Sequence, residues 1–189
     1  GYERKLTMSF VKNDCTQISF NDSMLSLTER ERKFLDKSWA KPFADNIFPA
    51  IKEDDFAVLY SDVASRPNTP VNIIIGSLIL KELLGLTDDE VMESLMFDIR
   101  FQYALHTTSF KEQPLSDRTL SRFRERCLTY EAMTGIDLIK NCITSLSAQI
   151  ADIMGINIAL KRMDSMMVAS NIKKLSRLEL LYTCVANFV

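Results

Sequence analysis

The 189-residue chain has few residues that interrupt regular structure. Only five glycines and five prolines occur, which argues against a loop-rich or disordered protein. No run of about 18 uncharged apolar residues is present, so the sequence predicts no transmembrane helix and no membrane partner. No apolar signal core follows residues 1–5.

Residues for metal binding and acid–base chemistry are equally scarce. The four cysteines are scattered without a C-x-x-C pair, and His106 is the single histidine. This composition argues against a zinc site, and we interpret the cysteines as reduced thiols of a cytoplasmic protein. One histidine excludes most acid–base machinery, and no Gly-rich phosphate loop, HExxH or Ser-His-Asp set appears. We interpret His106 as structural or exposed.

The net charge of −2 conceals a segregation of acids and bases along the chain. Residues 45–62 and 86–98 carry five acids each, with one base and none, respectively. Residues 100–126 carry six bases and three acids, and residues 161–177 carry five bases and one acid. Nucleic-acid binding requires a local basic face and not a basic total, so the late segments are candidates. Solvated helix faces are the alternative.

Repeated helix-start signals predict a mainly helical protein. Capping boxes occur as TERE at residues 28–31, TDDE at 87–90 and SRLE at 176–179. The stretch 70–84 is apolar almost all round, which predicts a central helix covered by other helices and ended by Gly85. The pair joined at residues 85–87 resembles a helix-turn-helix or an ordinary helical hairpin.

Further expectations concern the flanking segments. We expect Thr69 to cap the central helix, with Pro70 at its first position. Pro42 and Pro49 are expected to break the chain after the first helix. The apolar spacing also predicts which positions are buried in four helices. In the first two helices these are Phe34, Leu35 and Trp39, and then Phe56, Leu59 and Tyr60. In the helix after residue 87 they are Val91, Met92, Leu95, Met96 and Ile99, and in a long helix over 136–153 they are Ile139, Ile143, Leu146, Ile150 and Ile153.

The segment 116–127 predicts a capped helix with two faces. Leu120, Phe123 and Cys127 follow an i, i+3, i+7 spacing that is typical of a core stripe. The arginines at 118, 122 and 126 recur every four residues and form a row on another face. Arginines one turn apart repel each other mildly, and either solvent and salt or a polyanion can offset this repulsion. Phosphate contact is the functional hypothesis for this row.

Residues 158–163 predict a strand that ends at Asp164. Ile158, Leu160 and Arg162 share one face, and the intervening residues share the other. On spacing alone, an aspartate after such a strand is a capping or turn residue.

Three segments, taken in order, resemble the N-terminal half of bacterial insertion-sequence transposases of the DDE type. They are residues 66–103, which begin RPNTPVNIIIGSLILKELLG, the helix LSDRTLSRFRERC at 115–127, and RMDSMMVASNIKKLSR at 162–177. The resemblance implies a helical domain that contacts transposon DNA and assists dimerisation, followed by an RNase H-like catalytic core.

The resemblance also assigns a role to Asp164. It matches the first of three acidic residues that hold two divalent ions in that family, and Ser165 matches the residue that commonly follows. Met166 departs from the Thr that is frequent at the next position. Mg²⁺ or Mn²⁺ is therefore implied for the parent protein, since hard oxygen ligands suit these ions and two metals support phosphodiester cleavage. The other two acids would lie beyond Val189, so this chain alone is expected to be inactive in cleavage.

The sequence thus predicts a mainly α protein with three parts. Residues 1–27 form an arm, residues 28–154 a helical DNA-binding and assembly domain, and residues 155–189 the first strand and a helix of a truncated RNase H-like α/β core. The expected partners are transposon-end DNA and a second copy, with no small-molecule substrate. Asp164 is the candidate catalytic and metal residue, and the candidate DNA contacts are Arg118, Arg122, Arg126, Arg124, Lys173, Lys174 and Arg177. Two alternatives are a helical dimerisation module without DNA binding and an unrelated helical regulator.

Overall fold

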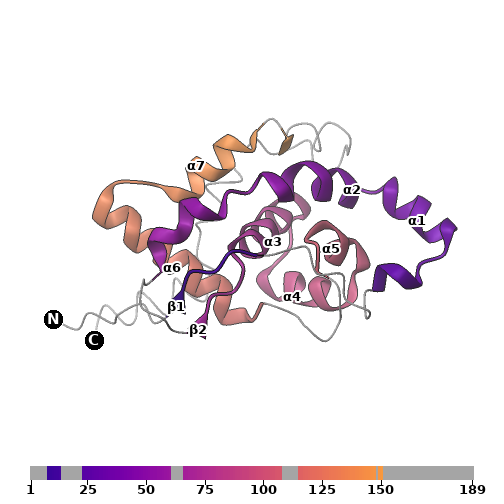
Figure 1. Cartoon of the computed structure of the whole chain (residues 1–189), viewed down its shortest axis with the longest axis horizontal. Helices are drawn as coiled ribbons and strands as arrows, with labels where there is room; N and C mark the ends of the chain where they lie inside the picture. The colour runs from indigo at the N-terminus through magenta and orange to yellow at the C-terminus, as the bar shows by residue number, and fades with distance from the viewer. Residues whose placement is uncertain (1–7, 14–22, 61–65, 108–114, 148, 151–189) are drawn as a thin grey trace.

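The computed structural model describes residues 8–13, 23–60, 66–107, 115–147 and 149–150, and it is mainly helical. Figure 1 shows helix α3 (Val71–Leu84) at the centre, surrounded by the other described helices. The hydrophobic core forms around it, with contacts from α3 to α4, α6 and the 3-10 helix η4. The predicted fold class of the helical part is confirmed. Residues 158–163, the expected strand, lie outside the described residues.

Helix α3 is buried on all sides, as its apolar sequence predicts. Eleven of its fourteen residues are buried. Gly85 ends the helix in the left-handed conformation with φ 69°, which a residue without a Cβ adopts at little cost. The prediction of a central helix ended by Gly85 is confirmed.

The N-terminus of α3 is capped by a residue distant in sequence. Glu53 Oε2 accepts hydrogen bonds from the amides of Val71 and Asn72, at 3.1 and 3.3 Å. Its other oxygen accepts from the amide of Asn13 at 3.1 Å, so the N-terminal segment joins the same carboxylate. The predicted cap at Thr69 is wrong, because α3 begins one residue later and a negative charge from another segment meets its amides.

The N-terminal half consists of short helical pieces. These are η1 (Ser23–Ser26), α1 (Glu29–Asp36), α2 (Ala40–Pro42), η2 (Phe43–Ile47), η3 (Phe48–Ala50) and η4 (Glu53–Leu59). The first capping box is present, with Thr28 accepting from the Glu31 amide. Phe34 is 65% exposed, so its predicted burial is wrong, whereas Leu35 is buried. The stretch that contains Pro42 and Pro49 is divided into short helices of changing pitch, with α2 ending at Pro42, in agreement with the expected break.

The segment after α3 forms α4 (Asp88–Phe97) and α5 (Ile99–Ala104). The second capping box is present at Thr87 and Glu90. Three of the predicted apolar positions are buried, namely Val91, Met92 and Leu95. Met96 is 39% exposed, so its predicted burial is wrong.

Two further helices complete the described fold, α6 (Asp117–Thr134) and α7 (Leu138–Ser145). Helix α7 ends at Ser145, and after a turn at Leu146 the described residues 147 and 149–150 are again helical. The apolar side chains at 139, 143, 146 and 150 are all buried as expected. The predicted position Ile153 lies outside the described residues.

A small extended pairing attaches the N-terminal segment to the helices. Strand β1 (Met8–Ser9) pairs in parallel with β2 (Arg66–Pro67). The Val11 amide then donates to Asn68 Oδ1 at 2.6 Å. Residues 8–13 therefore lie against the region just before α3 (Figure 1). Within the part of the chain that the structure describes, no helix is long and apolar enough to cross a membrane.

Candidate nucleic-acid interface

Helix α6 carries the predicted arginine row and is anchored by one apolar stripe. Leu120, Phe123 and Cys127 have exposed fractions of 0, 1 and 5%, which confirms the predicted core stripe. The Phe123 ring packs against Phe56 of η4 with centroids 5.6 Å apart. Helix α6 also contacts α3, α4 and α7. A helix held by so many neighbours is a rigid platform for the side chains on its outer face.

The sharpest electrostatic feature of α6 is an ion pair that faces inward. The Arg124 guanidinium donates two hydrogen bonds to the Asp88 carboxylate, each 2.8 Å long. Lys81 of α3 donates to the same carboxylate at 2.6 Å. Asp88 is the first residue of α4, so one carboxylate joins α3, α4 and α6.

The charge on Asp88 is strongly favoured in this setting. Burial by itself would raise the pKa of the carboxyl, but hydrogen bonds and positive charge from Arg124 and Lys81 outweigh burial and lower the pKa from 3.8 to about 2. The Asp88 carboxyl therefore remains ionised at neutral pH, and its contacts with Lys81 and Arg124 join the three helices.

Arg124 is consequently a structural residue, and its predicted role as a DNA contact is at odds with the structure. Its side chain is 1% exposed, and the bidentate pair occupies its guanidinium. The sequence contains a signal for this burial. Arg124 stands at i+4 of the stripe formed by Leu120, Phe123 and Cys127, which is a core-facing position on a helix.

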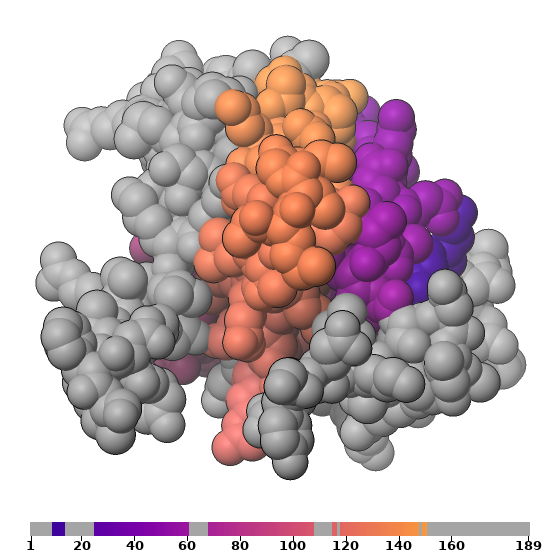
Figure 2. Space-filling model, turned by 90° about the vertical axis from the view of Figure 1, so that its left-hand side faces the viewer, coloured from indigo at the N-terminus to yellow at the C-terminus, as the bar shows by residue number. Residues whose placement is uncertain are grey.

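The arginines of the predicted row lie on the outer side of α6. Arg118 and Arg122 are exposed, and neither forms a salt bridge with another described residue. Arg126 is half-buried, and its guanidinium carbon lies 5.2 Å from the centroid of the Tyr60 ring. Figure 2 shows α6 and α7 running down the middle of one face of the molecule, beside the segment of residues 40–60. The structure thus brings the row to an accessible helix surface.

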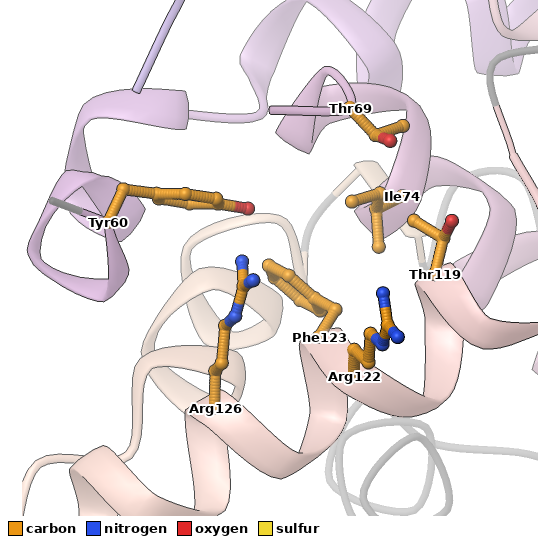
Figure 3. Close-up of a pocket in the computed structure, with 7 residues that line it drawn as sticks. All are labelled: Tyr60, Thr69, Ile74, Thr119, Arg122, Phe123 and Arg126. Atoms are coloured by element: carbon orange, nitrogen blue, oxygen red, sulfur yellow. The ribbon is translucent and has the colours of Figure 1, made fainter. Parts of the chain in front are cut away.

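A small hollow lies beside this row. Figure 3 shows Arg122 and Arg126 rising from α6 on the same side, with Tyr60 reaching in from the end of η4 and Thr69 opposite. Burial raises the pKa of the Tyr60 phenol more strongly than the positive charge of Arg126 lowers it. Tyr60 is therefore a neutral hydroxyl at physiological pH. No pattern in the sequence predicts this hollow or its hydroxyl groups, because its lining residues come from segments about 60 residues apart.

The remaining predicted site residues lie outside the described residues. They are Asp164, Lys173, Lys174 and Arg177. In the described ranges, no group of three or more His, Cys, Asp or Glu side chains lies close enough together to hold a metal ion. His106, which we interpret as structural or exposed, has its ring Nε2 3.2 Å from the Ala44 carbonyl oxygen.

Comparison with known proteins identifies one relationship. The family model described as transposase domain (DUF772) matches residues 32–126, which is half of the chain. The match begins in α1 and ends in α6, so it includes the central helix, the three-helix ion pair and the arginine row. No curated protein and no solved structure matches the chain.

Proposed function

Because this chain belongs to the transposase domain (DUF772) family, we propose that its helical domain binds the DNA of transposon ends through the outer face of α6. Membership of the family supports a transposase-related role. Beyond that role, we propose DNA binding by α6 and a cytoplasmic location in a bacterial cell.

The observation that carries the proposal is the exposure of Arg118 and Arg122 on a helix that is otherwise firmly packed. Guanidinium groups donate planar pairs of hydrogen bonds that match phosphate oxygens, and such contacts set the position of a protein on DNA. The inward ion pair of Arg124 with Asp88 supports the outer row, because it fixes the rotation of α6 against α4. Arginines on a fixed helix lose less conformational freedom on binding than arginines on a loop.

The catalytic part of the proposal rests on the resemblance alone. Asp164 would be the first of three carboxylates that hold Mg²⁺ or Mn²⁺ in the parent protein. Lys173, Lys174 and Arg177 would contact DNA near that centre. A two-metal site needs more than one carboxylate, so Asp164 would act only together with the other two acids of the set.

A salt titration of duplex binding tests the proposal. We expect the chain to bind a mixed-sequence duplex with an affinity that falls steeply as salt rises, because each phosphate contact releases counterions. The double variant Arg118→Ala/Arg122→Ala should reduce the slope of log K against log salt by about 2. Fluorescence anisotropy over a range of KCl concentrations measures both quantities.

The matched control removes two positive charges elsewhere. Lys33 and Lys37 are exposed in and just after α1, which Figure 1 places at the opposite end of the molecule from α6. Lys33→Ala/Lys37→Ala should leave the slope unchanged. An equal loss of slope in both double variants would show that net charge, and not the α6 face, determines binding.

A second candidate is a helical dimerisation module that does not bind DNA. Exposed apolar side chains favour it, since Phe97 is 74% exposed beside Met96 at the end of α4. Large exposed apolar groups that adjoin one another are typical of protein–protein contact. The same titration, combined with analytical ultracentrifugation, separates the two candidates. A chain that sediments as a dimer and binds no duplex at low salt would be the dimerisation module.

A further inference from the structure

The hollow beside α6 is built from three parts of the chain. Tyr60 follows η4, Thr69 precedes α3, Ile74 lies in the first turn of α3, and four residues come from α6 (Figure 3). Its volume is about 60 Å³. One water molecule needs roughly 10–15 Å³ of such space, so a small oxyanion of about four oxygen atoms matches the size of the hollow.

The lining chemistry selects for negative charge. Five of the seven lining side chains are polar, namely Tyr60, Thr69, Thr119, Arg122 and Arg126, and each can donate a hydrogen bond. The other two, Ile74 and Phe123, are apolar, and no carboxylate lines the hollow among the described residues. Guanidinium groups have no acceptor atoms, so a ligand between them must supply acceptors.

Part of this arrangement is held in place before any ligand arrives. The Arg126 guanidinium lies over the Tyr60 ring, and Tyr60 itself is only 8% exposed. Phe123 is 1% exposed and packs on Phe56 at the base of the hollow. A cation held over an aromatic ring in a defined position needs less ordering on binding than a solvated side chain.

We propose that this hollow is a phosphate-binding pocket in which Arg122 and Arg126 form a cationic pair and the hydroxyls of Tyr60 and Thr69 donate the remaining hydrogen bonds. The inference rests on the proposed function in one respect, because the phosphate is taken to be a single backbone phosphate of a duplex that lies along α6. Free phosphate has the same chemistry, so the experiment separates the two sources.

The pocket makes a prediction that a plain row of surface arginines does not make. The double variant Tyr60→Phe/Thr69→Val removes two hydroxyls, retains both shapes and changes no charge. It should weaken duplex binding about tenfold, since hydrogen bonds to a charged group are lost. The slope of log K against log salt should stay as in the wild type, because no counterion-releasing charge is removed.

A direct readout comes from the arginine side chains. The ¹⁵Nε signals of Arg122 and Arg126, assigned with Arg122→Lys and Arg126→Lys, are followed in the 189-residue chain while inorganic phosphate or duplex is added. Potassium chloride at equal ionic strength is the control. We expect both signals to shift saturably with phosphate and with duplex, and to stay in place with chloride. Unchanged backbone amide spectra of Tyr60→Phe/Thr69→Val establish that this variant is folded.

The outcomes separate the two proposals. Shifts with free phosphate but no duplex binding would support the pocket and overturn the DNA-binding proposal. Duplex binding that leaves both signals in place, or that is equally tight in Tyr60→Phe/Thr69→Val, would overturn the pocket while DNA binding stands. Shifts of equal size with chloride would show nonspecific screening and would also overturn the pocket.

Discussion

The arginines of α6 differ in role from one residue to the next: one is buried and structural, and others are exposed. Arg124 and Arg122 are two positions apart, yet Arg124 is 1% exposed and paired with Asp88 while Arg122 is exposed. Their difference follows from the helical period of about 3.6 residues per turn, which places positions i and i+2 on nearly opposite sides of a helix. A sequence of alternating arginines therefore contains both a structural clamp and a candidate binding surface.

The ion pairs of Asp88 with Arg124 and Lys81, here called the Asp88 clamp, predict a dependence of stability on pH. The pKa of Asp88 is lowered from 3.8 to about 2, so its contribution is present above pH 4 and is lost as pH falls through 2. We expect the free energy of unfolding to drop by about 2 kcal/mol over this window. Urea titrations between pH 5 and pH 2 measure the change.

The variant Asp88→Asn should be destabilised at neutral pH by about 3–5 kcal/mol, since Arg124 would remain buried without a counter-charge. It should also lose the Asp88 part of the pH dependence. Asp89→Asn, at an exposed neighbouring carboxylate in the same helix turn, is the control and should cost far less. Equal destabilisation by the two variants would disprove the clamp.

At the scale of helices, features that depend on local residue spacing can be predicted from the sequence. The all-apolar stretch of α3, its end at Gly85, two capping boxes and the core stripe of α6 could all be read from residue spacing. The cap of α3 by Glu53 and the pairing of Arg124 with Asp88 could not. These contacts join residues 18 and 36 positions apart, and the folded chain alone brings them together.

The Glu53 cap gives a prediction for α3. Glu53→Gln replaces one accepting oxygen with an NH₂ group, which leaves either an α3 amide or the Asn13 amide without its acceptor. We expect a loss of about 1–3 kcal/mol in the free energy of unfolding, measured by urea denaturation. Asp54→Asn is the matched control, because Asp54 is 65% exposed and its one salt bridge within the described residues is with Lys12, at 2.6 Å. If Glu53→Gln lowers the free energy of unfolding no more than Asp54→Asn does, Glu53 does not stabilise α3 as a cap.

At the scale of the whole molecule, the family match and the packing agree on which part is central. The match covers α1 through α6, the same helices that surround α3 and carry the clamp. The arginine row lies at the end of the matched segment, on the helix that Asp88 joins to α3 and α4. We therefore place the proposed DNA contact on α6 and not on the helices around α5.

Site-specific photo-crosslinking tests this central claim most directly. A benzophenone amino acid is placed at position 118 on α6, or at position 33 on α1 as control, and the chain is irradiated with a mixed-sequence duplex at low salt. We expect a covalent protein–DNA product from position 118 and little or none from position 33. Equal products from both positions, or a product from position 33 alone, would contradict DNA binding through α6.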